Sequence, residues 1–154
     1  MSTTSTFSAQ LLGQTEKAAN AILDRLLAQP GLTEAQWVTL TITAMSGATV
    51  DLGQLINRVT GALKISEGEA QARIAELSTA RLLRVPDDDH PTVELTDAGE
   101  RLYAHIRAAT AQITQRLWGD LPVEDLATAG RVLSTVLARA NEELAGPVAA
   151  RPGV

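Results

Sequence analysis

The residues with the clearest potential for chemistry lie in residues 86–91, where three consecutive aspartates and a histidine stand between two prolines. Carboxylate oxygens and an imidazole nitrogen are ligands for divalent cations, so this stretch is a candidate metal site. Adjacent residues on a turn rarely converge on one ion, however, and proline and aspartate are typical of a solvated turn. We therefore expect a turn here and no metal.

Motifs for catalysis are missing from the sequence. It contains no phosphate-binding loop, dinucleotide glycine fingerprint, zinc-protease helix motif or nucleophile elbow. It contains no cysteine, which excludes a disulfide framework and thiol chemistry and fits a cytoplasmic protein. We expect no enzyme and no cofactor.

Length and composition fit one domain, or one compact domain with an extension, and predict a helical, aliphatic core. The chain has 154 residues, of which 45% are hydrophobic and only four are aromatic. No apolar run is long enough to span a membrane, and the polar start does not resemble a signal peptide. The formal net charge of -5 provides no general attraction to nucleic acid or anionic lipid, so any such binding must be local.

The first half of the chain predicts four helices. Apolar residues recur at helical spacing over 7–28, and "QPGL" ends that pattern. Thr33 with Gln36 forms a capping box for a second helix, and Ser66 with Glu69 forms another for a helix that ends near residue 80. Between them, Asp51 is a plausible N-cap for a helix through "LGQLINRVTGAL". The third and fourth helices, separated by a short turn, suit a helix-turn-helix.

The second half predicts a small hairpin and two long helices. "RLLRV" and "TVELT" are typical of short strands, and the proline- and aspartate-rich residues 86–91 join them. Thr96 caps a helix over 97–118, and after "GDLP" a last helix continues to about residue 144. The fold class is therefore mainly α with a small β-hairpin wing, a winged helix-turn-helix with long N- and C-terminal helices.

The long helices predict self-association, because their apolar faces have too little domain to pack against. We expect dimerisation helices over 7–30 and 97–145, a winged helix-turn-helix over 31–96, a disordered N-terminus over 1–6 and a flexible tail over 146–154. The apolar residues assigned to the dimer interface are Leu11, Ile22, Ile113, Leu117, Leu133 and Leu137.

Over roughly residues 10–144 the sequence resembles the MarR family of bacterial transcription regulators. "GLTEAQWVTL" is similar to the family's second helix, and "VTGALKIS" followed by "EGEAQARIAEL" to its helix-turn-helix. "VELTDAGERLY" matches the end of its wing, where a Leu-Thr pair precedes a glycine. The resemblance implies a homodimer that binds double-stranded palindromic promoter DNA, with residues 66–80 as recognition helix and 86–91 as wing.

The resemblance also implies which residues bind DNA and which bind a small ligand. Side chains able to contact DNA are Arg58, Lys64, Ser66, Gln71, Arg73, Arg84 and His90. A small aromatic or anionic ligand would be held by Arg25, Trp37 and Arg107, although a core position for Trp37 and solvated helix faces for the arginines are simpler interpretations.

The predicted DNA surface departs from the family pattern in its charge. Arginines that usually enter the minor groove are replaced by Asp88 and Asp89, and Arg81 stands in place of a glycine. Residues 51–94 contain five basic residues against eight acidic ones, a net charge of -3. Arg84 is placed to pair with the wing aspartates, and protonated His90 would give the loop a cation.

The family resemblance and the acidic wing support two different hypotheses about function. The leading hypothesis is a DNA-binding repressor relieved by a small organic ligand. The alternative is a winged-helix dimer that has lost DNA binding and serves as a protein-interaction or small-molecule-binding module. An enzyme built on the same fold is the weakest hypothesis.

Overall fold

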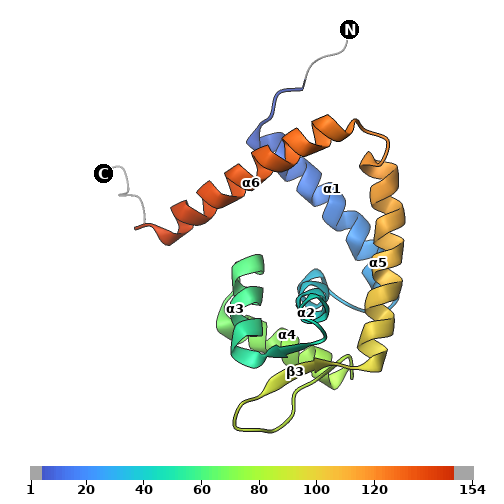
Figure 1. Cartoon of the computed structure of the whole chain (residues 1–154), viewed down its shortest axis with the longest axis vertical. Coiled ribbons are helices and arrows are strands. Elements are labelled where there is room, and N and C mark those ends of the chain that lie inside the picture. The colour runs from blue at the N-terminus through green and yellow to red at the C-terminus, as the bar shows by residue number, and fades with distance from the viewer. Residues whose placement is uncertain (1–4, 148–154) are drawn as a thin grey trace. The chain divides into compact units, whose positions relative to one another are not determined.

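The computed structural model describes residues 5–147, and the chain divides into two compact units, Met1–Gln112 and Ile113–Val154 (Figure 1). Most of the predicted disordered N-terminus and flexible tail, residues 1–4 and 148–154, lies outside the described residues. The predicted division of the chain by role, over 7–30, 31–96 and 97–145, stays a prediction.

The described chain is mainly helical with one small sheet, which confirms the predicted fold class. The first unit contains α1 (Ala9–Ala28), α2 (Glu34–Met45), β1 (Thr49–Asp51), α3 (Leu52–Leu63), α4 (Glu67–Thr79), β2 (Leu83–Arg84), β3 (Thr92–Leu95) and the greater part of α5 (Asp97–Trp118). The second unit contains the end of α5 and α6 (Val123–Ala145).

The predicted helix caps are confirmed. The Thr33 hydroxyl accepts from the Gln36 backbone N–H at 3.2 Å, and the Gln36 side chain accepts from the Thr33 N–H at 2.9 Å. Ser66 makes the same reciprocal pair of bonds at the start of α4. Asp51 accepts from the backbone of α3 at 3.0 Å. Local side-chain chemistry therefore starts each helix of the helix-turn-helix.

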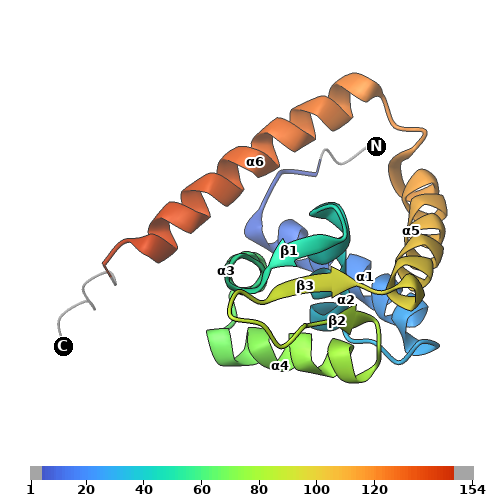
Figure 2. The ribbon, with the colours of Figure 1, turned by 60° about the horizontal axis from the view of Figure 1, so that its bottom comes forward.

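The sheet contains a strand that the sequence analysis missed. Its order is β1-β3-β2, all antiparallel, with Val50 opposite Val93 and Leu83 opposite Leu95 (Figure 2). The missed strand, β1, is only three residues long and follows Gly47 and Ala48, which have φ of 86° and 69°. A run this short shows no recognisable alternation, so only its pairing with β3 defines it.

The hydrophobic core of the first unit joins the helix-turn-helix to this sheet. Ala70, Ile74 and Leu77 form one buried face of α4, as the 3.6-residue period requires. They pack with residues from α2, α3 and the strands, namely Leu40, Val50, Leu55, Val59, Leu83 and Val93. The buried face of α4 fixes which of its side chains remain outside.

The base of the wing is held by Thr96 and Gly99. The Thr96 hydroxyl bonds the Arg81 carbonyl at 2.7 Å and accepts from the Gly99 backbone N–H at 3.0 Å. A Cβ at Gly99 would lie 2.2 Å from the Leu82 carbonyl oxygen, so only glycine fits there. Arg81 has a φ of 61°, the left-handed conformation that favours glycine, and this explains the glycine of the MarR pattern at that position.

Candidate nucleic-acid interface

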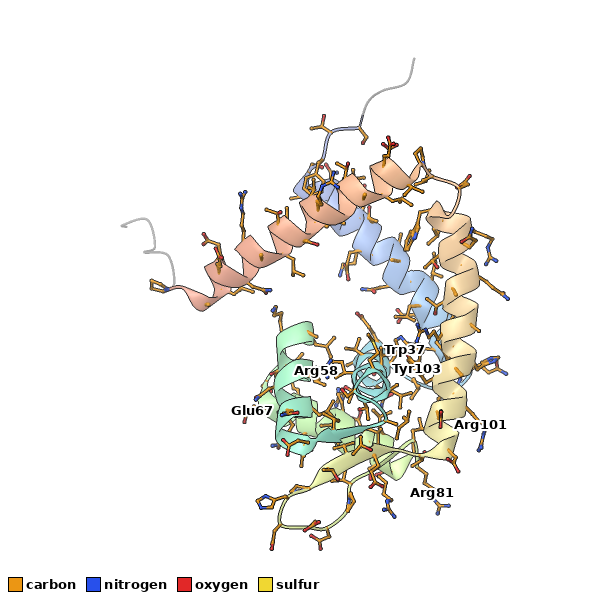
Figure 3. The ribbon with its side chains drawn as sticks, in the orientation of Figure 1. Trp37, Arg58, Glu67, Arg81, Arg101 and Tyr103 are labelled. Atoms are coloured by element: carbon orange, nitrogen blue, oxygen red, sulfur yellow. The ribbon has the colours of Figure 1, made fainter. Side chains whose placement is uncertain are left out.

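The second helix of the helix-turn-helix, α4, exposes a face that is mostly uncharged. Gly68, Gln71, Ala75 and Thr79 are exposed, and Ala72 is half-buried among them. Of the acidic residues in the first turn, Glu69 is engaged in the capping box and Glu67 is exposed (Figure 3). A helix in this position of a helix-turn-helix is the one that enters the DNA major groove.

The only basic residue of α4, Arg73, is already paired. Its guanidinium donates to Glu76 Oε1 at 2.8 Å, and its side chain is 31% exposed. Glu76 Oε2 accepts a second hydrogen bond, at 2.8 Å, from the amide of Gln36. Glu76 therefore links α4 to the first turn of α2 and holds Arg73 along the side of α4.

Three more predicted DNA contacts also have partners inside the protein. Arg58 donates to the Ser46 hydroxyl at 2.5 Å, and the ammonium group of Lys64 donates to the Gly61 carbonyl at 2.7 Å. Lys64 ends α3 in a left-handed conformation. The Ser66 hydroxyl accepts from the Glu69 N–H at 3.1 Å. To contact DNA, these side chains would have to share or replace their internal bonds. Their roles in DNA binding stay predictions.

The wing differs from the prediction in one ion pair. Arg84 does not pair with the wing aspartates; its guanidinium donates to Glu94 at 3.1 Å, directly across from it on β3. The strand register brings this pair together, while the turn carries the aspartates away from it. Asp87, Asp88, Asp89 and His90 are exposed, and within residues 5–147 none of the three aspartates has an ion-pair partner.

A shallow groove of about 340 Å³ lies between α3, α4 and the start of the wing. Its lining is largely apolar and includes Leu52, Ile56 and Val85. Gln71, Ala75 and Ser78 of α4 form its other side. The side-chain amide of Gln71 makes no hydrogen bond with any residue that the structure describes, so it is available to a ligand.

A second cluster contains two of the three residues predicted to hold a small ligand. The rings of Trp37 and Tyr103 stack with their centroids 5.6 Å apart (Figure 3). The guanidinium of Arg107 lies 5.8 Å from the centroid of the Tyr103 ring and donates to the Tyr103 hydroxyl at 3.1 Å. Trp37 also packs against the core, so the simpler interpretation of this residue holds beside the functional one.

The role of the third predicted ligand residue, Arg25, stays a prediction. Arg25 is exposed on α1, and no hydrogen bond or ion pair in residues 5–147 connects it with Trp37 or Arg107. Tyr103 was missed by the sequence analysis. Its position four residues before Arg107 on one helix, a spacing that brings side chains together, was the available signal.

The residues assigned to dimerisation lie at the surface or half-buried. Leu11 is 39% exposed in α1, and Leu137 is 60% exposed in α6. Leu117 and Leu133 are also exposed, whereas Ile22 and Ile113 are half-buried. None of the 23 residues of α6 is buried. An amphipathic helix without a buried side chain has an apolar face still to be covered.

Neither a metal-binding cluster nor a membrane-spanning helix is found in the described part of the chain. In that part of the chain no group of three or more histidine and acidic side chains is arranged to hold a metal ion. Across the same residues, every helix is too short or too polar to cross a bilayer.

The fold is shared with solved structures of transcription regulators. BpsR from Bordetella bronchiseptica, described with the regulation of its DNA binding by 6-hydroxynicotinic acid, is 24% identical, with a TM-score of 0.67 over 82% of this chain and 96% of that one. A MarR mutant from E. coli complexed with operator DNA is 20% identical, with a TM-score of 0.67 over 83% and 91%.

A MarR-family regulator from Rhodococcus sp. RHA1 is 16% identical, with a TM-score of 0.68 over 82% of this chain and 90% of that one. No protein-family model matches the sequence, and no curated protein matches it. At these identities the similarity establishes the fold, which is the winged-helix fold of MarR-family regulators.

Proposed function

We propose that this protein is a dimeric MarR-like transcriptional regulator, a repressor that binds double-stranded palindromic promoter DNA in the cytoplasm and releases it when a small organic ligand binds. The observation that carries the proposal is α4, whose unburied face stands beside an exposed wing in a fold shared with an operator-bound MarR structure. A face of this kind can enter the major groove while the wing approaches the neighbouring minor groove.

The bare apolar face of α6 supports the dimer. Leu133 and Leu137 are exposed one helical turn apart, and Leu144 is 69% exposed two turns further on. Covering such a face with a second copy removes it from water, and a two-fold dimer presents two recognition helices to a palindrome. The half-sites would then lie about 34 Å apart, one turn of DNA.

The cluster of Trp37, Tyr103 and Arg107 supports the ligand site. Stacked rings provide an apolar surface for an aromatic compound, and a guanidinium beside them pairs with a carboxylate. Trp37 lies next to Gln36, whose amide bonds Glu76 of the recognition helix at 2.8 Å. A ligand that shifts the start of α2 would therefore favour a different position of α4 and lower the affinity for the operator.

The test of DNA binding is an anisotropy titration of the purified protein against duplex DNA from its own upstream region and against a scrambled duplex. We expect tighter binding to the native sequence and a loss of affinity with added salt, because the phosphate contacts release counterions. The Arg58→Ala and Arg84→Ala variants should bind both duplexes more weakly. Equal and negligible binding to both duplexes would reject the proposal.

The test of the ligand site uses Trp118→Phe, which leaves Trp37 as the only tryptophan. Benzoate and 6-hydroxynicotinate are the probes, since both are aromatic carboxylates. Binding should change the Trp37 fluorescence and release DNA, and Arg107→Ala should weaken both effects. Arg101→Ala, an arginine on the same helix but outside the cluster, is the matched control.

A second function is favoured by the charge of the wing. The carboxylates of residues 87–89 are exposed and have no ion-pair partner in the described chain, so phosphate would repel them. Arg73 and Arg84 are each engaged by a glutamate. These features suit a winged-helix dimer that binds a protein or a small molecule in place of DNA. Failure of every duplex to bind, together with ligand binding at Trp37, would favour this function.

A further inference from the structure

We propose that Gln71 determines the sequence preference of the recognition helix by reading adenine, and that Ala75 contacts the methyl group of a nearby thymine. This inference rests on the proposed function, in which α4 enters the major groove. The proposed function leaves open which base pairs α4 selects, and Gln71 and Ala75 would determine them.

Guanine is the base that α4 is least equipped to read. Arginine or lysine, bonded to the O6 and N7 atoms of guanine, is the usual reader of that base. Residues 67–79 contain one basic side chain, Arg73, and Glu76 holds its guanidinium at 2.8 Å. Arg73 also lies two positions beyond Gln71, on another side of the helix. The open side of α4 that lies along the groove therefore offers no cation to a base.

Gln71 has the chemistry for adenine. Its amide carries both a donor and an acceptor, which match the N7 and N6 positions of adenine as a pair of hydrogen bonds. Gln71 is exposed, and its side-chain amide has no hydrogen-bond partner within residues 5–147, unlike the side chains of Arg58, Ser66, Arg73 and Arg84. Gln71 can therefore bind a base without breaking an internal bond, and it lies nearer the middle of the exposed face of α4 than Ser78 and Thr79, which lie at the end of the helix.

The apolar groove restricts where that amide can go. Gln71 lines the groove together with Ile56 of α3 and Val85 of the wing. The aliphatic stem of Gln71 can rest on these side chains while its amide stays in water, which reduces the rotamer freedom lost on binding. A Gln71 side chain held in this way favours a hydrogen bond with one particular base.

Ala75 extends the reading surface along the same side. It lies one helical turn after Gln71, about 6 Å further along the axis, and is exposed at the edge of the groove. An alanine methyl is among the side-chain groups that contact the thymine C5 methyl. Since base pairs are about 3.4 Å apart, the thymine should lie one or two base pairs from the adenine that Gln71 reads.

The experiment begins by selecting bound duplexes from a random pool with the full-length chain. We expect adenine–thymine pairs at the positions under α4 in each half-site. Anisotropy titrations then compare the selected duplex with one in which a single adenine–thymine pair is replaced by guanine–cytosine. The wild-type protein should lose affinity by about 5-fold to about 100-fold, and Gln71→Ala should bind the two duplexes equally.

Two base analogues separate a direct contact from a general weakening. Replacing the adenine by 7-deazaadenine removes N7, and should weaken the wild-type protein but not Gln71→Ala. Replacing the thymine by uracil removes the methyl group that Ala75 contacts, and should weaken both proteins. The control variant is Gln14→Ala, at another exposed glutamine on α1, which should keep the wild-type preference.

The outcomes distinguish the two proposals. Sequence-specific binding whose preference survives in Gln71→Ala would overturn this inference and leave the regulator intact. Binding to no duplex would overturn both. A guanine–cytosine requirement under α4, lost in Arg73→Ala, would show that Arg73 leaves Glu76 to read the base and would also overturn the inference.

Discussion

The base and the tip of the wing differ in how firmly the rest of the protein holds them. At the base, Thr96 and Gly99 bind or touch the backbone of residues 81 and 82, and a single added methyl group would not fit. At the tip, residues 87–90 are exposed, and their aspartates have no ion-pair partner in the described chain. Packing therefore restricts the residues of the base, whereas no such packing restricts residues 87–90 of the tip.

The largest effect is expected at the base, from Gly99→Ala. Its Cβ would lie 2.2 Å from the Leu82 carbonyl oxygen and 2.8 Å from Leu95 Cδ1, so α5 must move away from the residue before β2 and from the end of β3. We expect a loss of about 3 kcal/mol in the free energy of unfolding, measured by denaturant titration. Gly61→Ala, in open space on α3, should instead stabilise the protein by about 0.5 kcal/mol. Equal effects of the two substitutions would contradict the packing at the base.

The tip should respond in DNA affinity and not in stability. Replacing Asp88 and Asp89 by arginine changes the free energy of unfolding by less than about 0.5 kcal/mol, because both side chains are exposed. Two cations at the minor groove should raise affinity about 10-fold and steepen the dependence of log K on log salt by about 2. Anisotropy titrations at several salt concentrations measure both.

The matched control for the tip places the same charge change elsewhere. Asp120→Arg with Glu124→Arg, near the start of α6, alters the net charge of the protein equally but lies outside the predicted DNA surface. It should leave the salt dependence nearly unchanged. If this control strengthens binding as much as the wing variant does, net charge and not the wing accounts for the gain.

A smaller effect is expected from Thr96→Val, which keeps the shape of the side chain and removes its hydroxyl. The variant loses the N-cap of α5 and the bond to the Arg81 carbonyl at 2.7 Å. We expect its free energy of unfolding to be about 1 kcal/mol lower than that of the wild type. Thr135→Val, whose hydroxyl bonds only its own exposed helix, is the comparison and should differ little from wild type.

The smallest effect is expected between base and tip, at the Arg84–Glu94 pair. The two side chains are 69% and 38% exposed, so solvent screens their attraction. A double-mutant cycle with Arg84→Ala and Glu94→Ala should give a coupling of about 0.5 kcal/mol in thermal or denaturant unfolding. A coupling several times larger would mean that this pair, and not Thr96 and Gly99, fixes the wing.

The sequence by itself determined the features that depend on neighbours along the chain. The capping boxes at Thr33 and Ser66, the N-cap at Asp51 and the start of α5 at Thr96 each join residues three positions apart, so spacing alone predicts them. The buried face of α4 likewise follows from the helical period.

Only the tertiary structure decided which distant residues meet. β1 is defined by its pairing with β3, and Arg84 was assigned to the aspartates of the turn although the strand register places it opposite Glu94. The stacking of Trp37 on Tyr103 and the link from Gln36 to Glu76 join residues 66 and 40 positions apart. Contacts of this kind depend on how helices and strands pack, which no local spacing encodes. They left Gln71 without an internal partner while Arg58, Arg73 and Arg84 each found one.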